Sequence, residues 1–120
     1  NISINGTGSF YPELNSVLER PEFMSKEELG WLQEQSVVGD IALRFFDKDG
    51  KECKTELADR MITIGFEQFK KIDTKITIAS GGYKAQTVLS ALKGKLIDVL
   101  IIDYQLGRRI MELYRTEAEK

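Results

Sequence analysis

The chain has 120 residues and a mass of 13.6 kDa, the size of one ordinary domain. Hydrophobic residues make up 42% and charged residues 30%, a balance typical of a soluble globular protein and not of a disordered or collagen-like chain. The formal net charge is -2, from 17 basic and 19 acidic residues. This balance argues against a surface dedicated to nucleic acid, because binding to phosphates needs clustered Lys and Arg.

Several kinds of chemistry are excluded by residues that are missing. Histidine is absent, and Cys53 is the single cysteine. An intrachain disulfide, a zinc site built from Cys or His, and His-dependent nucleophilic catalysis are therefore excluded. We expect no metal and no cofactor, so any acid–base chemistry would fall to carboxylates, Lys or Tyr.

The sequence carries no signal for a membrane or for secretion. No apolar run approaches about 18 residues, so we expect no transmembrane helix and no membrane partner. The first residues, Asn1–Asn5, lack the basic and apolar regions of a secretory signal, and they also lack an initiator Met. The chain begins directly in strand-like sequence, which suggests a fragment of a longer cytoplasmic polypeptide.

Short segments rich in β-branched, aromatic or alternating residues predict the strands. Asp49-Gly50 is a hairpin signal, and the spacing of Asp47 to Gly50 does not fit a calcium-binding loop. The continuous apolar run Ile97–Ile102 is typical of a central strand that is covered on both faces. The predicted strands are residues 2–4, 41–46, 51–54, 62–64, 75–79 and 97–102.

Apolar spacing and capping signals predict the helices. Ser25 and Glu28 have the spacing of a capping box, and Val88, Leu89 and Leu92 form an apolar stripe. The predicted helices are residues 14–18, 26–35, 66–71, 83–92 and 106–118. Residues 6–9, rich in Gly, are expected to form a turn. The strand, helix, strand, helix order of the last third predicts an α/β fold with a mostly parallel sheet and a right-handed crossover.

A glycine corner between a predicted strand and helix is one candidate ligand site. Gly81 and Gly82 precede the helix, so free backbone N–H groups and the helix dipole favour an anion there. Lys84 adds a positive charge in the first turn. The competing interpretation is a plain turn with an exposed lysine.

A second glycine corner follows the first predicted strand. Gly6, Thr7 and Gly8 match neither the dinucleotide fingerprint nor a P-loop, although such a turn would let a ligand approach closely. In open α/β sheets, ligands bind outside the carboxyl ends of the strands, where both corners are expected. A simple connection between elements is equally compatible with the sequence.

Two further charged residues are candidates for ligand contacts. Asp40, after Gly39, would accept hydrogen bonds from a sugar hydroxyl or simply cap a turn. Arg60 would bind a phosphate or else pair with its neighbour Asp59. Arg108-Arg109 is interpreted as solvated charge that matches the dipole of the last predicted helix.

In its order of segments, the chain resembles the effector-binding domain of SorC-type bacterial transcriptional regulators, a sugar-responsive family. The resemblance extends over nearly the whole chain and corresponds to the C-terminal half of such a domain. The segments that carry it are Gly6–Ser9, Ser25–Leu29, Val38–Asp47, Asp49-Gly50, Asp59–Ile64, Gly81–Ala85 and Leu89–Asp103.

The resemblance implies a Rossmann-like, three-layer αβα sandwich, similar to that of sugar-phosphate isomerases. Residues 1–120 would be part of this sugar-binding domain, and the helix-turn-helix region that binds DNA would lie outside the chain. The resemblance also implies an effector site. Its residues would be Gly6, Thr7, Gly8, Asp40, Gly81, Gly82, Lys84 and Arg60. In it, Lys84 would contact phosphate and Asp40 a hydroxyl.

We therefore expect part of a sugar-responsive transcriptional regulator and not an enzyme. Its partners would be a phosphorylated sugar and other copies of the same protein in a homo-oligomer, with DNA bound only through the missing N-terminal region. Two alternatives stay open. One is a fragment of a sugar-phosphate isomerase or transferase, with Asp40, Asp98 or Asp103 as a base; the other is an oligomerisation module without a ligand.

Overall fold

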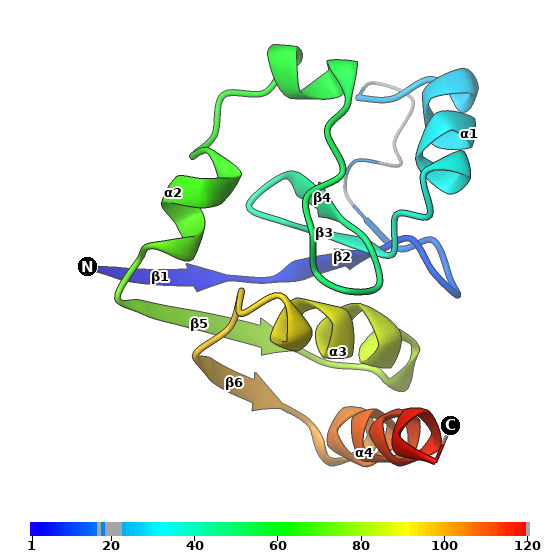
Figure 1. Cartoon of the computed structure of the whole chain (residues 1–120), viewed down its shortest axis with the longest axis vertical. Coiled ribbons are helices and arrows are strands. Elements are labelled where there is room, and N and C mark those ends of the chain that lie inside the picture. The colour runs from blue at the N-terminus through cyan, green and yellow to red at the C-terminus, as the bar shows by residue number, and fades with distance from the viewer. Residues whose placement is uncertain (17, 19–22, 120) are drawn as a thin grey trace.

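The computed structural model describes residues 1–16, 18 and 23–119, which form two small sheets and the helices around them (Figure 1). The first sheet is parallel, with the strand order β1 (Ile2–Asn5), β5 (Thr74–Ala79) and β6 (Val99–Ile102). The second sheet is antiparallel. The predicted α/β class, with a parallel sheet and an added hairpin, is confirmed. None of the described helices is both long and apolar enough to span a bilayer.

The alternation predicted for the last third builds the parallel sheet. From β5 the chain passes through a short 3-10 helix, η3 (Gly82–Lys84), into α3 (Ala85–Lys93), and then returns as β6. The next helix is α4 (Tyr104–Ala118). Asp103 caps it, because its Oδ1 atom accepts a hydrogen bond of 2.7 Å from the Leu106 backbone N–H.

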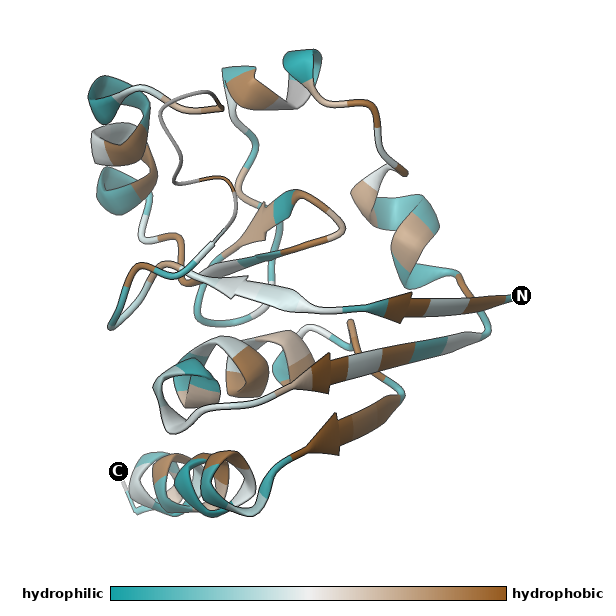
Figure 2. Cartoon of the chain, turned by 180° about the vertical axis from the view of Figure 1, so that it is seen from behind, coloured by the Kyte–Doolittle hydropathy of each residue, from teal (hydrophilic) through white to brown (hydrophobic). Residues whose placement is uncertain are grey.

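The two faces of the parallel sheet have different surroundings. Side chains at alternate positions of β5, such as Thr77 and Ala79, are buried under α3 and α4. The opposite face is largely exposed in the described part of the chain, and the strand register brings its aliphatic side chains together in one patch, the open isoleucine face. Its residues are Ile2, Ile4, Ile76, Ile78, Val99 and Ile101. Hydrophobic residues occur along all three strands of this sheet (Figure 2). The prediction of a central strand covered on both faces at residues 97–102 is therefore wrong, since β6 is an edge strand of the sheet that the described residues form.

The antiparallel sheet has the order β2 (Thr7–Ser9), β3 (Gly39–Ile41) and β4 (Arg44–Phe46). Two predictions fail here. Residues 7–9, expected in a turn, form a strand that continues from β1. Residues 41–46, expected as one strand, are broken at Ala42 and Leu43, whose φ angles of 49° and 62° turn the chain back on itself.

The capping box is confirmed at the start of α1 (Lys26–Glu34). The Glu28 backbone N–H donates to Ser25 Oγ, and the Ser25 N–H donates to Glu28 Oε1, each at 3.2 Å. The helix expected at 14–18 is wrong over residues 14–16, because Asn15 instead forms a bridge with Ser9. Residues 17 and 19–22 lie outside the described part of the chain.

The middle of the chain agrees with prediction only in part. Helix α2 (Phe66–Lys70) is confirmed. Residues 62–64 are irregular and not a strand, and the return strand expected at 51–54 is reduced to a single bridge between Glu52 and Phe46. The hairpin turn itself is present and ends at Gly50, whose φ of 77° favours glycine.

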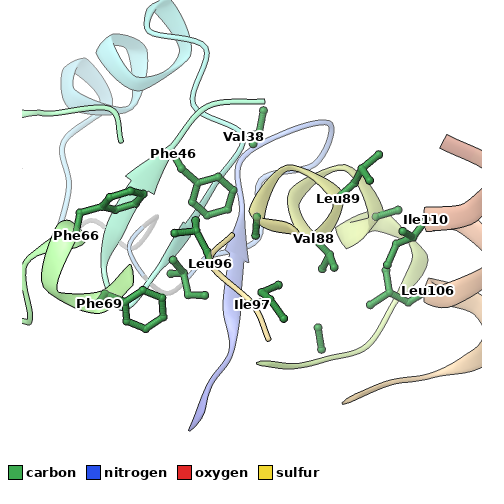
Figure 3. Packing of buried hydrophobic residues seen from close by; sticks show 14 residues of the cluster. Val38, Phe46, Phe66, Phe69, Val88, Leu89, Leu96, Ile97, Leu106 and Ile110 are labelled. Atoms are coloured by element: carbon green, nitrogen blue, oxygen red, sulfur yellow. The ribbon is translucent and has the colours of Figure 1, made fainter. Parts of the chain in front are cut away.

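A large apolar cluster joins the two sheets to α2, α3 and α4 (Figure 3). Phe46 from the antiparallel sheet packs with Phe66, Phe69 and Leu96, and it is fully buried. The hairpin turn also contacts the end of α3 so closely that a Cβ added at Gly94 would collide with the backbone of Gly50. The antiparallel sheet is thus fixed against the parallel one, which positions the cavity between them.

Candidate functional site

A cavity of about 450 Å3 lies where β1 passes into β2, at the carboxyl end of β1. Five of the predicted site residues line it: Gly6, Thr7, Gly8, Asp40 and Lys84. Gly6 lies between β1 and β2, and the other four come from β2, β3 and η3, elements that are far apart in the sequence. Three polar residues that the sequence analysis missed, Asn5, Asn15 and Ser16, complete the polar lining.

The floor of the cavity is a cross-strand pair between Gly8 on β2 and Asp40 on β3. A Cβ added at Gly8 would collide with Asp40 Oδ1 and Ser16 Oγ. Glycine is therefore required here for space and not for a turn. The local fold leaves room for a carboxylate on the floor of the site.

Asp40 is a buried carboxylate, with only 6% of its surface exposed. Ser16 Oγ donates a hydrogen bond of 2.8 Å to Asp40 Oδ1. Burial raises the pKa of Asp40 to about 6, although the bond from Ser16 and the charge of Lys84 act in the opposite direction. The carboxylate is therefore incompletely compensated, and a donor on a ligand would stabilise its charged form.

Lys84 links the two glycine corners. Its Nζ atom extends from η3 to the glycine corner at residues 6–8, where it donates a hydrogen bond of 3.0 Å to the Thr7 backbone oxygen. The same ammonium group lies 5.9 Å from the centre of the Tyr83 ring. Of the second glycine corner, only Lys84 lines the cavity.

Two polar atoms near Lys84 lack protein partners. Asn5 Oδ1 and Thr7 Oγ1 are buried and have no hydrogen bond within the described residues. Buried polar atoms are normally paired, so unpaired ones that line a cavity indicate a place for a polar ligand. With Asp40 they offer acceptors for hydroxyl groups, and Lys84 supplies a positive charge.

Gly81 and Gly82 do not line this cavity. The Gly81 N–H donates to Asp103 Oδ2 at 3.0 Å, so Asp103, which the sequence analysis considered only as a base in the enzyme alternative, joins the glycine corner to the start of α4. Gly82 borders a separate cavity of about 700 Å3 next to α4. Arg108 and Arg109 also border it, and both pair with Glu112.

Arg60 is not brought to the cavity. It ends the 3-10 helix η2 (Glu56–Arg60) and forms an ion pair with Glu28 of α1. This pair stands in place of the contact with Asp59 that the sequence suggested. The guanidinium is more than half exposed.

Comparisons with known proteins identify the family to which the chain belongs. Residues 1–112 match the family described as "Putative sugar-binding domain", and the chain belongs to this family. It is 33% identical over 111 residues to the deoxyribonucleoside regulator of Bacillus subtilis, a match that covers 92% of this chain and 34% of that protein.

Solved structures show the same relationship. A DeoR family transcriptional regulator from Listeria monocytogenes is 36% identical with a TM-score of 0.81, over 91% of this chain and 43% of that one. The full-length sorbitol operon regulator SorC from Klebsiella pneumoniae is 25% identical with a TM-score of 0.78, over 92% and 35%. The resemblance to SorC-type regulators is thereby confirmed, and the chain spans about a third of the length of the curated relatives it matches.

Proposed function

We propose that this chain supplies the effector-binding part of a bacterial transcriptional regulator and that its effector is a sugar, preferably a phosphorylated one. The observation that carries the proposal is the polar cavity between the sheets. A buried carboxylate, two unpaired buried acceptors and one ammonium group surround the same space. This set suits the hydroxyl groups and the negative charge of a sugar phosphate.

In this proposal Asp40 accepts a hydrogen bond from a sugar hydroxyl, and Thr7 and Asn5 satisfy others. Lys84 contacts the phosphate, and the backbone at Gly6 and Gly8 lets the ligand approach closely. The N–H of Gly82 would assist only with an extended ligand, because Gly82 borders the neighbouring cavity. Arg60 takes no part, since it is held by Glu28 at a distance from the cavity.

The rest of a regulator would complete the domain. The open isoleucine face is a parallel-sheet face without a helical layer in the described residues, whereas parallel sheets are normally covered on both sides. We propose that the remaining part of the effector domain packs on it, and that a separate region binds DNA. Such a regulator would act in the cytoplasm, where its DNA is, and it would sense its ligand without catalysing a reaction.

Binding is tested by calorimetry with ribose 5-phosphate, glucose 6-phosphate, their unphosphorylated forms and inorganic phosphate. We expect a sugar phosphate to bind more tightly than either of its parts. Lys84→Met should weaken that binding by about 10- to 100-fold, the scale of a charge-assisted hydrogen bond. Lys48→Met, in the exposed hairpin turn, is the matched control and should change nothing. Equal binding by wild type and Lys84→Met would contradict the proposal.

A further inference from the structure

Ser16 lies at the effector cavity because the loop before it is closed by backbone contacts. Ser9 and Asn15 form a bridge with two hydrogen bonds, 2.8 Å from the Ser9 N–H to the Asn15 oxygen and 2.7 Å from the Asn15 N–H to the Ser9 oxygen. The hydroxyl of Ser9, which is fully buried, donates to the Glu13 backbone oxygen within the loop at 2.8 Å. The position of Ser16 is thus set by its neighbours, and its own hydroxyl is available for another contact.

The backbone next to Ser16 determines the direction of its hydrogen bond to Asp40. The Leu18 N–H donates to Ser16 Oγ at 3.2 Å, and the single proton of the Ser16 hydroxyl is donated to Asp40 Oδ1 at 2.8 Å. Both Ser16 and Asp40 are buried, so water does not replace this bond. A hydroxyl donates more strongly to a carboxylate than to a neutral carboxyl group. Ser16 therefore favours the ionised form of Asp40.

Few other groups of the described chain can hold Asp40 in its ionised form. On the neighbouring strands it pairs with Gly8 and Phe45, neither of which is charged. Lys84 is the one other charged residue that lines the cavity in the part of the chain that the structure describes. Burial raises the pKa of Asp40, the bond from Ser16 lowers it, and the charge of Lys84 lowers it less. A phosphate bound at Lys84 would offset that charge, which leaves Ser16 as the remaining group that favours ionisation.

We propose that Ser16 is a positioning residue of the effector site, which keeps Asp40 ionised and orients it to accept a hydrogen bond from a sugar hydroxyl. This role rests on the proposed function, because the hydroxyl belongs to the effector. A protonated Asp40 accepts hydrogen bonds less well, so affinity for the effector should fall as the pH drops and Asp40 takes up a proton. Without Ser16 this loss of affinity should begin at a higher pH.

Titration calorimetry of the whole chain with ribose 5-phosphate and glucose 6-phosphate, between about pH 6 and 8.5, tests the role of Ser16. Ser16→Ala should bind about fivefold more weakly than wild type at pH 6 and equally well at pH 8.5, as expected when the pKa of Asp40 rises by about one unit. The phosphate of the ligand also titrates near pH 6, but its contribution is the same for both proteins and cancels in the ratio. Ser16→Thr keeps the hydroxyl and should behave as wild type. Thr116→Ala, which removes an exposed hydroxyl on α4, is the control and should change nothing.

Carbon-13 NMR of the carboxyl groups tests Ser16 without a ligand. The signal of Asp40 is assigned by its loss in Asp40→Asn, and its titration midpoint should be higher in Ser16→Ala than in wild type. Equal midpoints would overturn the proposal, as would a loss of affinity in Ser16→Ala that is the same at every pH, since a displaced loop weakens binding at all pH values alike. A higher midpoint in a protein that binds no sugar phosphate would overturn the proposed function alone, because Ser16 would still control Asp40. Circular dichroism checks that the variants are folded, and the comparison of Ser16→Ala with wild type is decisive even if Ser16→Thr does not fold.

Discussion

Lys75 and Asp40 are both charged residues buried in the fold, but their surroundings differ. Lys75, on the covered face of the parallel sheet, is 5% exposed. Its Nζ atom donates to the backbone oxygens of Lys70 and Ile72, each at 3.1 Å, and lies 3.0 Å from Asp98 Oδ2. Asp40, on the antiparallel sheet, is about as buried but receives one side-chain hydrogen bond.

This difference in hydrogen bonding distinguishes a charge that stabilises the fold from a charge that can bind a ligand. All three donors of Lys75 have partners, so the charge fixes the end of α2 to β5 and leaves nothing for a ligand. Asp40 keeps unused acceptor capacity and lines a cavity with two unpaired polar atoms. A buried charge that the protein satisfies itself is structural, whereas one that it leaves partly unsatisfied indicates binding.

The largest expected effect comes from breaking the satisfied charge. Lys75→Met keeps the length of the side chain but leaves two backbone oxygens without donors. We expect a loss of about 2 to 4 kcal/mol in the free energy of unfolding, measured in urea. Sugar phosphate affinity should not change. Lys70→Met, exposed on α2, is the control, and an equal loss there would show that Lys75 has no special role.

Asp40→Asn should raise the free energy of unfolding, whereas Lys75→Met lowers it. The pKa of Asp40 is about 6 in the folded protein against an ordinary 3.8, so folding favours the protonated carboxyl. Its contribution to stability is therefore fully present below about pH 4 and is lost as the pH rises through 6. At pH 7 the amide should raise the free energy of unfolding by about 1 to 2 kcal/mol, within the roughly 3 kcal/mol that two pKa units allow.

The test of this prediction has two parts. Urea unfolding of Asp40→Asn and wild type should differ at pH 7 and converge near pH 4. Calorimetry should show weaker binding of a sugar phosphate despite the higher stability. A stability difference that does not depend on pH would show that the carboxyl of Asp40 is not shifted by burial.

The same contrast explains how much the sequence could predict. The capping box at Ser25 and the alternation around α3 are local signals, and both were predicted correctly. The position of β2 was not predicted, because two glycines at positions 6 and 8 indicate a turn when only their sequence neighbours are considered. Gly8 is instead a strand residue whose missing side chain makes room for Asp40, a distant residue.

The candidate site shows this limit as well. Asp40 and Lys84 could be proposed as ligand contacts from the resemblance and from charge near glycine corners. Asn15 and Ser16 could not, because they lie in a segment that resembles a helix and reach the cavity only through the bridge between Asn15 and Ser9. Arg60 was proposed from its charge and from the resemblance, and neither could reveal its partner Glu28, which comes from the packing of η2 on α1.

The substitution Gly8→Ala tests whether the ligand binds at the floor of the cavity. The added methyl group would lie too close to Asp40 Oδ1 and to both Oγ and Cβ of Ser16. Because rotation does not move the Ser16 Cβ, the backbone must shift as well, and stability should fall by about 2 kcal/mol. Binding of a sugar phosphate should be lost, since the methyl group occupies the floor of the cavity. Gly30→Ala is the matched control, because a Cβ at Gly30 meets nothing within 4 Å. Retained binding in Gly8→Ala would exclude this floor as the ligand site.

The smallest effect is expected at Arg60, whose charge is neither buried like that of Lys75 nor part of the cavity like that of Asp40. Its pair with Glu28 is a surface pair, and such pairs contribute at most about 1 kcal/mol. Arg60→Ala should therefore change the free energy of unfolding by less than about 0.5 kcal/mol, and sugar phosphate affinity should stay the same. Weaker binding in this variant would mean that η2 moves to the cavity when the ligand binds. Arg60 would then belong with Lys84 among the phosphate contacts, and the division between scaffold and site would have to be redrawn.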